Sequence, residues 1–220
     1  MQQAIVSPKQ LKEYKSFGLH NYKTIAQIQQ LSPSLLEAIE VVGHVLPFKT
    51  NNYVVDELID WSKVPNDPMF TLTFPRREML LPHHYQKMKA TLESGASKNE
   101  IKQVANDIRM ELNPNPAAQG KNVPMLGNTK LTGIQHKYRE TVLFFPSHGQ
   151  TCHAYCSFCF RWPQFVGMDE MKFAMKETEL LVAYLKEHRE VTDVLFTGGD
   201  PMVMKASILR TYIEPLLSDE

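Results

Sequence analysis

The sequence has no long apolar run, no excess of charge of either sign and few cysteines. None of its apolar runs approaches the roughly 18 to 20 residues that a helix needs to cross a membrane. The first six residues (MQQAIV) lack the basic stretch and the apolar core of a secretory signal peptide. The 24 Lys and Arg residues balance the 24 Asp and Glu residues, which argues against a polyanion such as nucleic acid as the main partner. We therefore expect a cytoplasmic globular protein that binds neither membrane nor nucleic acid.

The three cysteines of the chain all lie in one short stretch. Cys152, Cys156 and Cys159 have the spacing C-x3-C-x2-C. Soft sulfur ligands that converge in this way suit an iron–sulfur cluster or zinc. In a chain without a secretion signal they indicate metal ligands rather than disulfides. A 4Fe-4S cluster has four irons, so three thiolates leave one iron open to a small molecule.

A structural zinc site is the alternative interpretation of the cysteines. Zinc favours four closed ligands, and His148 or His153 could complete a set of three cysteines and one histidine. The usual zinc spacing pairs C-x2-C with a distant second pair, which this chain lacks. The spacing therefore favours the cluster over zinc.

Apolar periodicity and helix caps predict a helical first half. We expect helices over 33–43, 82–92 and 101–112, with a short helix or turn over 51–61. Gly43 is expected to end the first of them. The second half changes in character, with continuous apolar runs over 141–146 and 193–197, as in strands buried on both faces.

A helix is expected after each of these strands, over 176–189 and 205–217. Strand–loop–helix repeated twice predicts an α/β fold with a parallel sheet, in which ligands bind at the carboxyl ends of the strands. The cysteine stretch and Gly198-Gly199 both follow a predicted strand. The expected organisation is a helical region (1–112), an extended linker rich in Pro, Gly and Asn with few packed side chains (113–133), and the start of an α/β core (134–220).

Two motifs resemble those of the radical S-adenosylmethionine (SAM) enzymes. The cysteine spacing followed by an aromatic residue and Arg161 is the first, and the run VLFTGGDP, with Gly198, Gly199 and Asp200, is the second. The resemblance implies a 4Fe-4S cluster held by the cysteines, SAM on the open iron and on the glycine edge, a reducing electron donor, and a 5′-deoxyadenosyl radical. It also implies a partial (β/α) barrel, of which only the opening strand–helix units are visible. We therefore expect a shortened, N-terminal form.

Within that superfamily the chain resembles the lysine 2,3-aminomutases. The segment 134–145 is similar to the one that precedes their cluster, and Asn66–Met69 is similar to an upstream N-D-P element. The resemblance implies pyridoxal 5′-phosphate (PLP) near Tyr138 and Lys137, and Arg161 pairing with a substrate carboxylate. It implies migration of an amino group between carbons 2 and 3 of a free amino acid, or action on a protein lysine, by a possible homo-oligomer.

Three positions depart from the pattern of those enzymes. Thr141 replaces an arginine that helps to hold PLP, and Trp162 and Pro163 replace basic residues. The PLP lysine and the acidic residues that recognise the distal amine belong to the C-terminal part of the family's fold, which this sequence does not show. Two alternatives from other classes stay open: a non-catalytic iron–sulfur protein that transfers electrons or senses redox state, and a zinc-stabilised interaction domain.

Several other residues have simpler interpretations. Tyr155 and Phe158 are expected to shield the cluster from water, and Asp200 could cap the following turn instead of touching a ligand. His83 and His84 are adjacent on a predicted helix and should not face the same way, so we interpret them as a solvated face. The methionine-rich run 168–175 is interpreted as packing or a lid.

Overall fold

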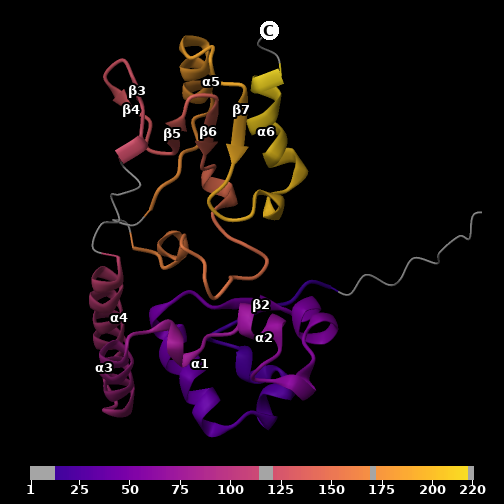
Figure 1. Cartoon of the computed structure of the whole chain (residues 1–220), viewed down its shortest axis with the longest axis vertical. Coiled ribbons are helices and arrows are strands. Elements are labelled where there is room, and N and C mark those ends of the chain that lie inside the picture. Colours follow the sequence, from indigo (N-terminus) through magenta and orange to yellow (C-terminus); the bar gives the residue numbers. More distant parts are fainter. Residues whose placement is uncertain (1–12, 114–120, 169–171, 218–220) are drawn as a thin grey trace, which may run out of the picture.

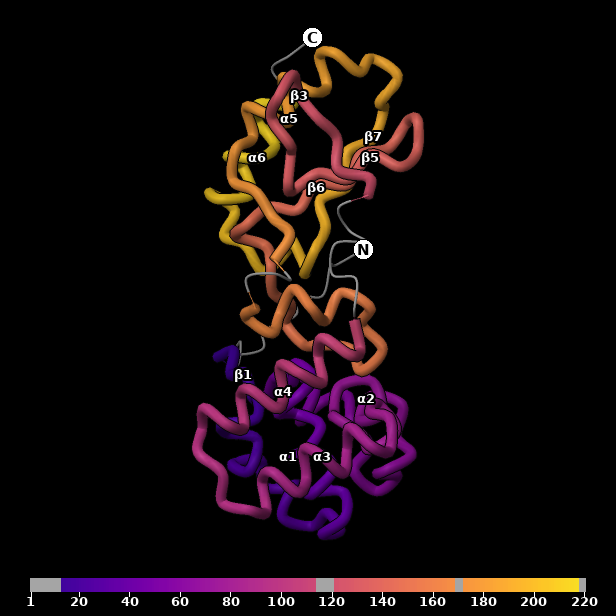
Figure 2. The backbone as a smooth tube through the Cα atoms, turned by 90° about the vertical axis from the view of Figure 1, so that its left-hand side faces the viewer, coloured from indigo at the N-terminus to yellow at the C-terminus, as the bar shows by residue number. Residues whose placement is uncertain are grey.

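The computed structural model describes residues 13–113, 121–168 and 172–217 (Figure 1). The N-terminal part, residues 13–113, is mainly helical, and residues 121–145 and 172–217 contain a small sheet with two helices. The segment that carries the cysteines runs between these two parts in both views (Figures 1 and 2). None of the described helices is both long and apolar enough to cross a membrane.

The N-terminal part contains four helices and a small antiparallel sheet. These elements are β1 (Ser16–Gly18), α1 (Pro33–Val45), β2 (Lys49–Asn51), α2 (Pro68–Thr73), α3 (Pro82–Glu93) and α4 (Lys98–Leu112). Two clusters of buried side chains hold them together. One lies under β1, β2 and α2, and the other lies between α1, α3 and α4. The predicted helical first half is confirmed.

Helix starts follow the predicted caps, but one predicted end is wrong. Ser97 and Glu100 form the capping box of α4, with Glu100 Oε2 accepting from the Ser97 N–H at 2.8 Å. Helix α1 continues through Gly43 to Val45. A Cβ at position 43 would lie 2.8 Å from Leu19 Cδ1, so this glycine permits close packing inside the helix and does not end it. The segment 51–61 is a mixture: β2 ends at Asn51 and a π-helical turn follows over Val54–Leu58.

The sheet of the second part has three strands in the order β5-β6-β7. Its strands and helices are β5 (Ile134–Tyr138), β6 (Thr141–Phe144), α5 (Thr178–Glu187), β7 (Asp193–Phe196) and α6 (Ala206–Leu217). Strands β6 and β7 are parallel and joined through α5, which confirms the α/β prediction. Strand β5 pairs antiparallel with β6 and was not predicted. No closed barrel forms among the described residues, so the partial barrel stays a prediction.

One face of this sheet is covered and the other is open. Helices α5 and α6 lie on the same side of the strands (Figure 2). Val142 and Phe144 are buried against them, whereas Leu195 of β7 is 52% exposed. The prediction that both apolar runs are buried on both faces is therefore wrong for β7, because both helices pack against the same face.

The segment expected to be an extended linker has structure of its own. Within its described residues, β3 (Met125–Leu126) and β4 (Thr129–Lys130) form a hairpin, and Leu131 is fully buried in the cluster under the sheet. The expectation of few packed side chains therefore fails for Leu131. The domain boundaries at 112 and 133 stay a prediction. Residues 169–171 of the methionine-rich run lie outside the described residues, and Met175 at its end is buried.

The capping box gives a test of the N-terminal part. Ser97→Ala removes the Oγ that accepts the Glu100 N–H at 3.3 Å, so we expect the free energy of unfolding to fall by about 1 kcal/mol. Urea unfolding followed by circular dichroism measures it. Ser94→Ala is the matched control, because Ser94 Oγ only donates to the Thr91 carbonyl. Equal losses for the two variants would show that the cap has no special role.

Candidate functional site: the cysteine loop

The cysteine loop, residues 146–168, lies at the carboxyl ends of β6 and β7. Strand β6 leads directly into it, and the arrow of β7 points toward it (Figure 1). The loop contains only short 3-10 turns and no α-helix or strand. Its conformation therefore depends on hydrogen bonds to other parts of the chain, because an irregular segment cannot satisfy its own backbone groups.

The middle of the loop is bonded to the N-terminal part through its backbone. The Tyr155 N–H donates to the Lys49 carbonyl at 2.8 Å, and the Ser157 N–H donates to the Leu72 carbonyl at 2.7 Å. Ser157 Oγ adds a bond to the Thr71 carbonyl at 2.8 Å. These bonds lie beside Cys156 in the sequence, so the N-terminal part sets the local backbone of that cysteine.

The carbonyl of His153 is a second attachment point. It accepts from Tyr14 OH at 3.1 Å and from Asn51 Nδ2 at 3.2 Å. Asn51 is buried, and its Oδ1 accepts the Val54 N–H at 3.1 Å. The imidazole of His153 points elsewhere, with Nδ1 2.9 Å from Asp200 Oδ2. His153 thus joins the N-terminal part to the end of β7.

The two glycines after β7 allow the start of the loop to pack against bare backbone. Gly198 has φ +115°, and an added Cβ would overlap the amide of Gln150. A Cβ at Gly199 would overlap the backbone of Thr151, whose carbonyl accepts the Asp200 N–H at 2.7 Å. We expected a ligand to approach this edge, and in the structure the chain's own loop approaches it. Asp200 also caps the next turn, as its Oδ1 accepts the Met202 N–H at 2.9 Å.

The cysteine thiols are only partly covered. Cys152 and Cys159 are half-buried and Cys156 is exposed. Burial, together with the nearby Cys159 and Asp200, raises the pKa of Cys152 to about 11, and burial raises the pKa of Cys159. A bound metal cation would reverse this preference, because it stabilises the thiolate.

The positions of the three cysteine sulfurs are relevant to the choice between an iron–sulfur cluster and a zinc site. Thiolates on one tetrahedral zinc ion lie about 3.8 Å apart, because each Zn–S bond is about 2.3 Å long. In the described part of the chain, the cysteines do not form a group with all ligand atoms within 4.8 Å of one another. The imidazoles proposed to complete a zinc site have other partners: His153 faces Asp200, and His148 Nδ1 lies 2.6 Å from Tyr212 OH. In this arrangement the described cysteine and histidine side chains are not gathered around a single ion.

Arg161 lies next to the cysteines. Its guanidinium carbon is 4.3 Å from the ring centre of Phe145 and 5.2 Å from that of Phe160. Burial lowers the pKa of Arg161, and the nearby Cys159 partly offsets this. A half-buried guanidinium with its planar donors beside the cysteine loop can bind a carboxylate.

The aromatic residues of the loop differ in exposure. Tyr155 stacks on Phe165 with ring centres 4.5 Å apart. Phe158 is 78% exposed, so in this arrangement it does not shield the loop from water as expected.

Lys137 and Tyr138 are not brought to the cysteine loop. Tyr138 pairs with Thr141, at the opposite end of β6 from Phe144, which leads into the loop. Three residues of strand separate the two ends by about 10 Å. Both side chains are exposed, with the Lys137 amine 5.4 Å from the Tyr138 ring centre. Their role in PLP binding stays a prediction, and the structure does not place these two side chains next to the cysteines.

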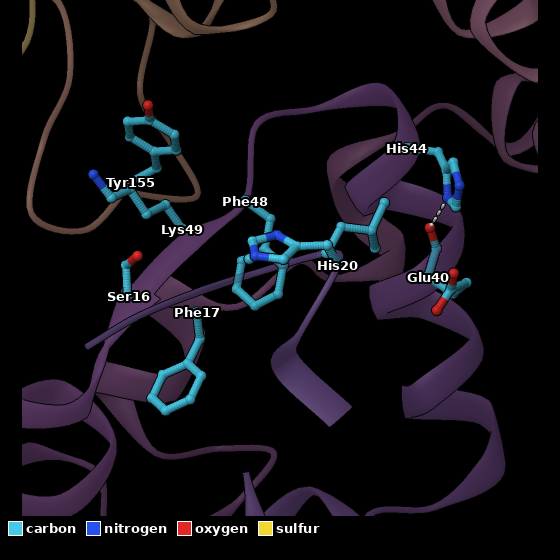
Figure 3. Close-up of a pocket in the computed structure, with 10 residues that line it drawn as sticks. Ser16, Phe17, His20, Glu40, His44, Phe48, Lys49 and Tyr155 are labelled. Atoms are coloured by element: carbon cyan, nitrogen blue, oxygen red, sulfur yellow. Dashed lines mark hydrogen bonds between the residues drawn. The ribbon is translucent and has the colours of Figure 1, made fainter. Parts of the chain in front are cut away.

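A cavity of about 600 Å³ lies next to the loop on the side of the N-terminal part (Figure 3). Lys49 and Tyr155 line it beside the loop, and Glu40 and His44 line it from α1. Lys49 Nζ also donates to Thr151 Oγ1 at 3.3 Å. Sequence reasoning missed this cavity, because its lining comes from segments more than 100 residues apart.

Comparison with known proteins identifies similar chains of one kind. The chain is 28% identical over 189 residues to a putative L-lysine 2,3-aminomutase of Aquifex aeolicus, which covers 86% of this chain and 40% of that protein. It is 36% identical over 83 residues to the L-lysine 2,3-aminomutase of Haemophilus influenzae, covering 38% of this chain and 23% of that protein. It is 31% identical over 91 residues to the L-lysine 2,3-aminomutase of Bacillus subtilis, covering 41% of this chain and 19% of that protein.

The predicted resemblance to part of the lysine 2,3-aminomutases is therefore confirmed. The chain spans about two fifths or less of the length of these relatives. No family model matches the chain, and no solved structure matches it.

The contact at Gly199 predicts how a methyl group there would act. Gly199→Ala should displace the loop, because the Cβ overlaps the backbone of Thr151, which cannot rotate away. We expect the half-buried thiols of Cys152 and Cys159 to react several-fold faster with a thiol reagent. Gly149→Ala is the control, since its Cβ would meet side-chain atoms only at 3.4 Å or more. An unchanged rate in Gly199→Ala would contradict this packing.

The attachment at Asn51 gives a milder test. Asn51→Asp keeps the acceptor for the Val54 N–H but replaces the amide donor to the His153 carbonyl with an oxygen. We expect a loss of about 1–3 kcal/mol in stability and faster reaction of the thiols, because the His153 carbonyl loses one of its two donors and a carboxylate oxygen then faces it. Asn21→Asp is the control, since Asn21 Oδ1 likewise accepts a backbone N–H, that of Gly18, and its Nδ2 donates to the Ser16 carbonyl rather than to the loop. Equal thiol reactivity in both variants would show that Asn51 does not position the loop.

Proposed function

We propose that this chain is a radical SAM protein of the lysine 2,3-aminomutase type. One observation carries the proposal: a three-cysteine loop is held at the carboxyl edge of a parallel strand pair, directly against Gly198 and Gly199. The names of the similar proteins support the same class. In this proposal Cys152, Cys156 and Cys159 hold a 4Fe-4S cluster that leaves one iron free.

The donor set fits a cluster, and the residues around it have defined roles. When bound, the cluster would supply the one-electron reduction of SAM to methionine and a 5′-deoxyadenosyl radical, with the electron taken from a separate reducing donor. Asp200 and the Gly198-Gly199 backbone would orient the amino group of SAM. Arg161 would bind a substrate carboxylate beside the cysteines.

The substrate and the second cofactor belong to the proposal as well. By analogy with the names of the similar enzymes, the substrate is a free amino acid whose amino group migrates between carbons 2 and 3. Action on a lysine of a protein would be a different reaction, because the nitrogen on carbon 2 is then part of the peptide bond. A homo-oligomer is also part of the proposal. Lys137 and Tyr138 lie at the far end of β5, so they do not fit a PLP site shared with the cysteines in this arrangement.

A non-catalytic iron–sulfur protein is the second candidate, and one observation favours it. Gln150 and Thr151 pack on the two glycines, where SAM is expected to bind. Gln150 Nε2 donates to the carbonyls of Pro146 and Thr197 at 2.9 and 3.3 Å, so its side chain is held in place. If this packing persists, the cluster can exchange electrons without meeting SAM.

Anaerobic reconstitution with iron and sulfide, followed by electron paramagnetic resonance with and without SAM, separates the candidates. We expect a cluster signal that changes when SAM is added, that is lost in Cys156→Ser and that is retained in His153→Ala. Gln150→Ala should strengthen the response to SAM, because it uncovers Gly198. A signal indifferent to SAM in the unaltered chain and in Gln150→Ala would favour the electron carrier. A protein that retains zinc and forms no cluster would contradict the radical SAM proposal.

A further inference from the structure

A group of metal-ligating side chains lies far from the cysteine loop in sequence, between α3 and α4. These helices pack side by side (Figure 1) and are joined by a short turn. His83 and His84 lie in the first turn of α3, and Glu111 lies in the last turn of α4. The antiparallel pairing brings these two ends together.

The three side chains converge. One nitrogen of each imidazole and one oxygen of Glu111 all lie within 4.8 Å of one another. His84 Nε2 is 2.8 Å from Glu111 Oε2, and the two imidazole ring centres are 4.0 Å apart. Among the described residues, no other group of three or more His, Cys, Asp or Glu side chains is gathered this closely.

The interpretation of both histidines as a solvated face is wrong for His84. His83 is exposed, but His84 is 2% exposed and packs beside the core of α1, α3 and α4. Its Nδ1 is buried and has no hydrogen-bond partner among the described residues. The nitrogen that faces Glu111 is the other one, Nε2, so the contribution of His84 to a site is an imidazole that the surrounding core holds in place beside Glu111.

We propose that His83, His84 and Glu111 bind a divalent transition-metal ion of the zinc class, which ties the start of α3 to the end of α4. Two imidazoles and a carboxylate form a known zinc ligand set, with water in the fourth position. Imidazole ligands select such ions over magnesium and calcium, which prefer oxygen.

The local charges bear on this site in two opposite ways. Glu111 lies in the last turn of α4, and the carbonyl end of that helix favours a bound cation. Lys87 acts against it, since its Nζ is 3.8 Å from Glu111 Oε1. Removing the Lys87 charge should therefore tighten metal binding.

The test uses cobalt(II) and zinc on the full chain with all three cysteines replaced by serine, so that no thiolate competes. We expect one equivalent to bind with a visible cobalt spectrum typical of nitrogen and oxygen ligands. His83→Ala and Glu111→Gln should weaken binding at least tenfold, and Lys87→Gln should strengthen it. Zinc should also raise the melting temperature of the parent chain and leave that of the two weakened variants unchanged.

The chain offers a matched control. His136, His188 and Glu190 form another group of two histidines and one glutamate, with His188 Nδ1 2.9 Å from Glu190 Oε1, but its ligand atoms are not gathered within 4.8 Å. His188→Ala and Glu190→Gln should leave cobalt binding unchanged. Equal losses in both sets, or no bound equivalent in the parent chain, would overturn the proposal.

A second measurement covers the case in which the serine variant does not fold. In the unaltered chain, the equivalents of bound cobalt can be counted. Cobalt that is bound by the cysteines can be distinguished from cobalt bound elsewhere by its thiolate-to-cobalt absorption. His83→Ala should lose one equivalent without that absorption and keep the thiolate-bound metal. Loss of thiolate-bound metal alone would place the ion at the cysteines and contradict the proposal. Failure of the radical SAM proposal would leave these outcomes unaffected.

Discussion

Main-chain hydrogen bonds from two sides hold the cysteine loop, and the proposed cluster chemistry depends on them. A segment without regular structure has to be ordered by its surroundings, at a cost of about 1–2 kcal/mol per residue in backbone entropy. The Lys49 and Leu72 carbonyls bond the loop from the N-terminal part, and the Asp200 N–H bonds it from the end of β7. Because the partners are mostly backbone groups, the folds of the two parts set the loop conformation.

The backbone of Gly198 and Gly199, after β7, can be covered by only one group at a time. Backbone without a Cβ accepts either the start of the loop or a small molecule, but not both in the same volume. In this structure Gln150 and Thr151 occupy the space next to Gly198 and Gly199. Gln150 also has a buried Oε1 without a partner among the described residues. An unsatisfied amide oxygen weakens this packing, so exchange of the Gln150 side chain for a polar ligand is physically reasonable.

Local signals were sufficient to predict the capping box, the parallel strand pair and the helices α1, α3, α4, α5 and α6, because caps and apolar periodicity act over a few residues. The short helix α2 was not predicted. Contacts between distant segments were not predictable. Strand β5 has little apolar alternation and owes its place to pairing with β6. Likewise, nothing near Asn51 indicates that its amide bonds to His153, 102 residues later. Gly43 had a helix-stop signal, and packing against Leu19 overrode it.

The two proposed metal sites differ in chemistry, but both lie next to the buried core that α1, α3 and α4 form. The cysteine loop carries soft thiolates on irregular backbone, whereas His84 and Glu111 are fixed on two helices. Trp162, three residues after Cys159, packs against the same buried core that α3 and α4 form with α1. An ion that fixes the α3–α4 pair would therefore also fix the surface on which Trp162 rests. The helix pair and the loop would then be coupled through packing, because a close-packed core transmits displacement.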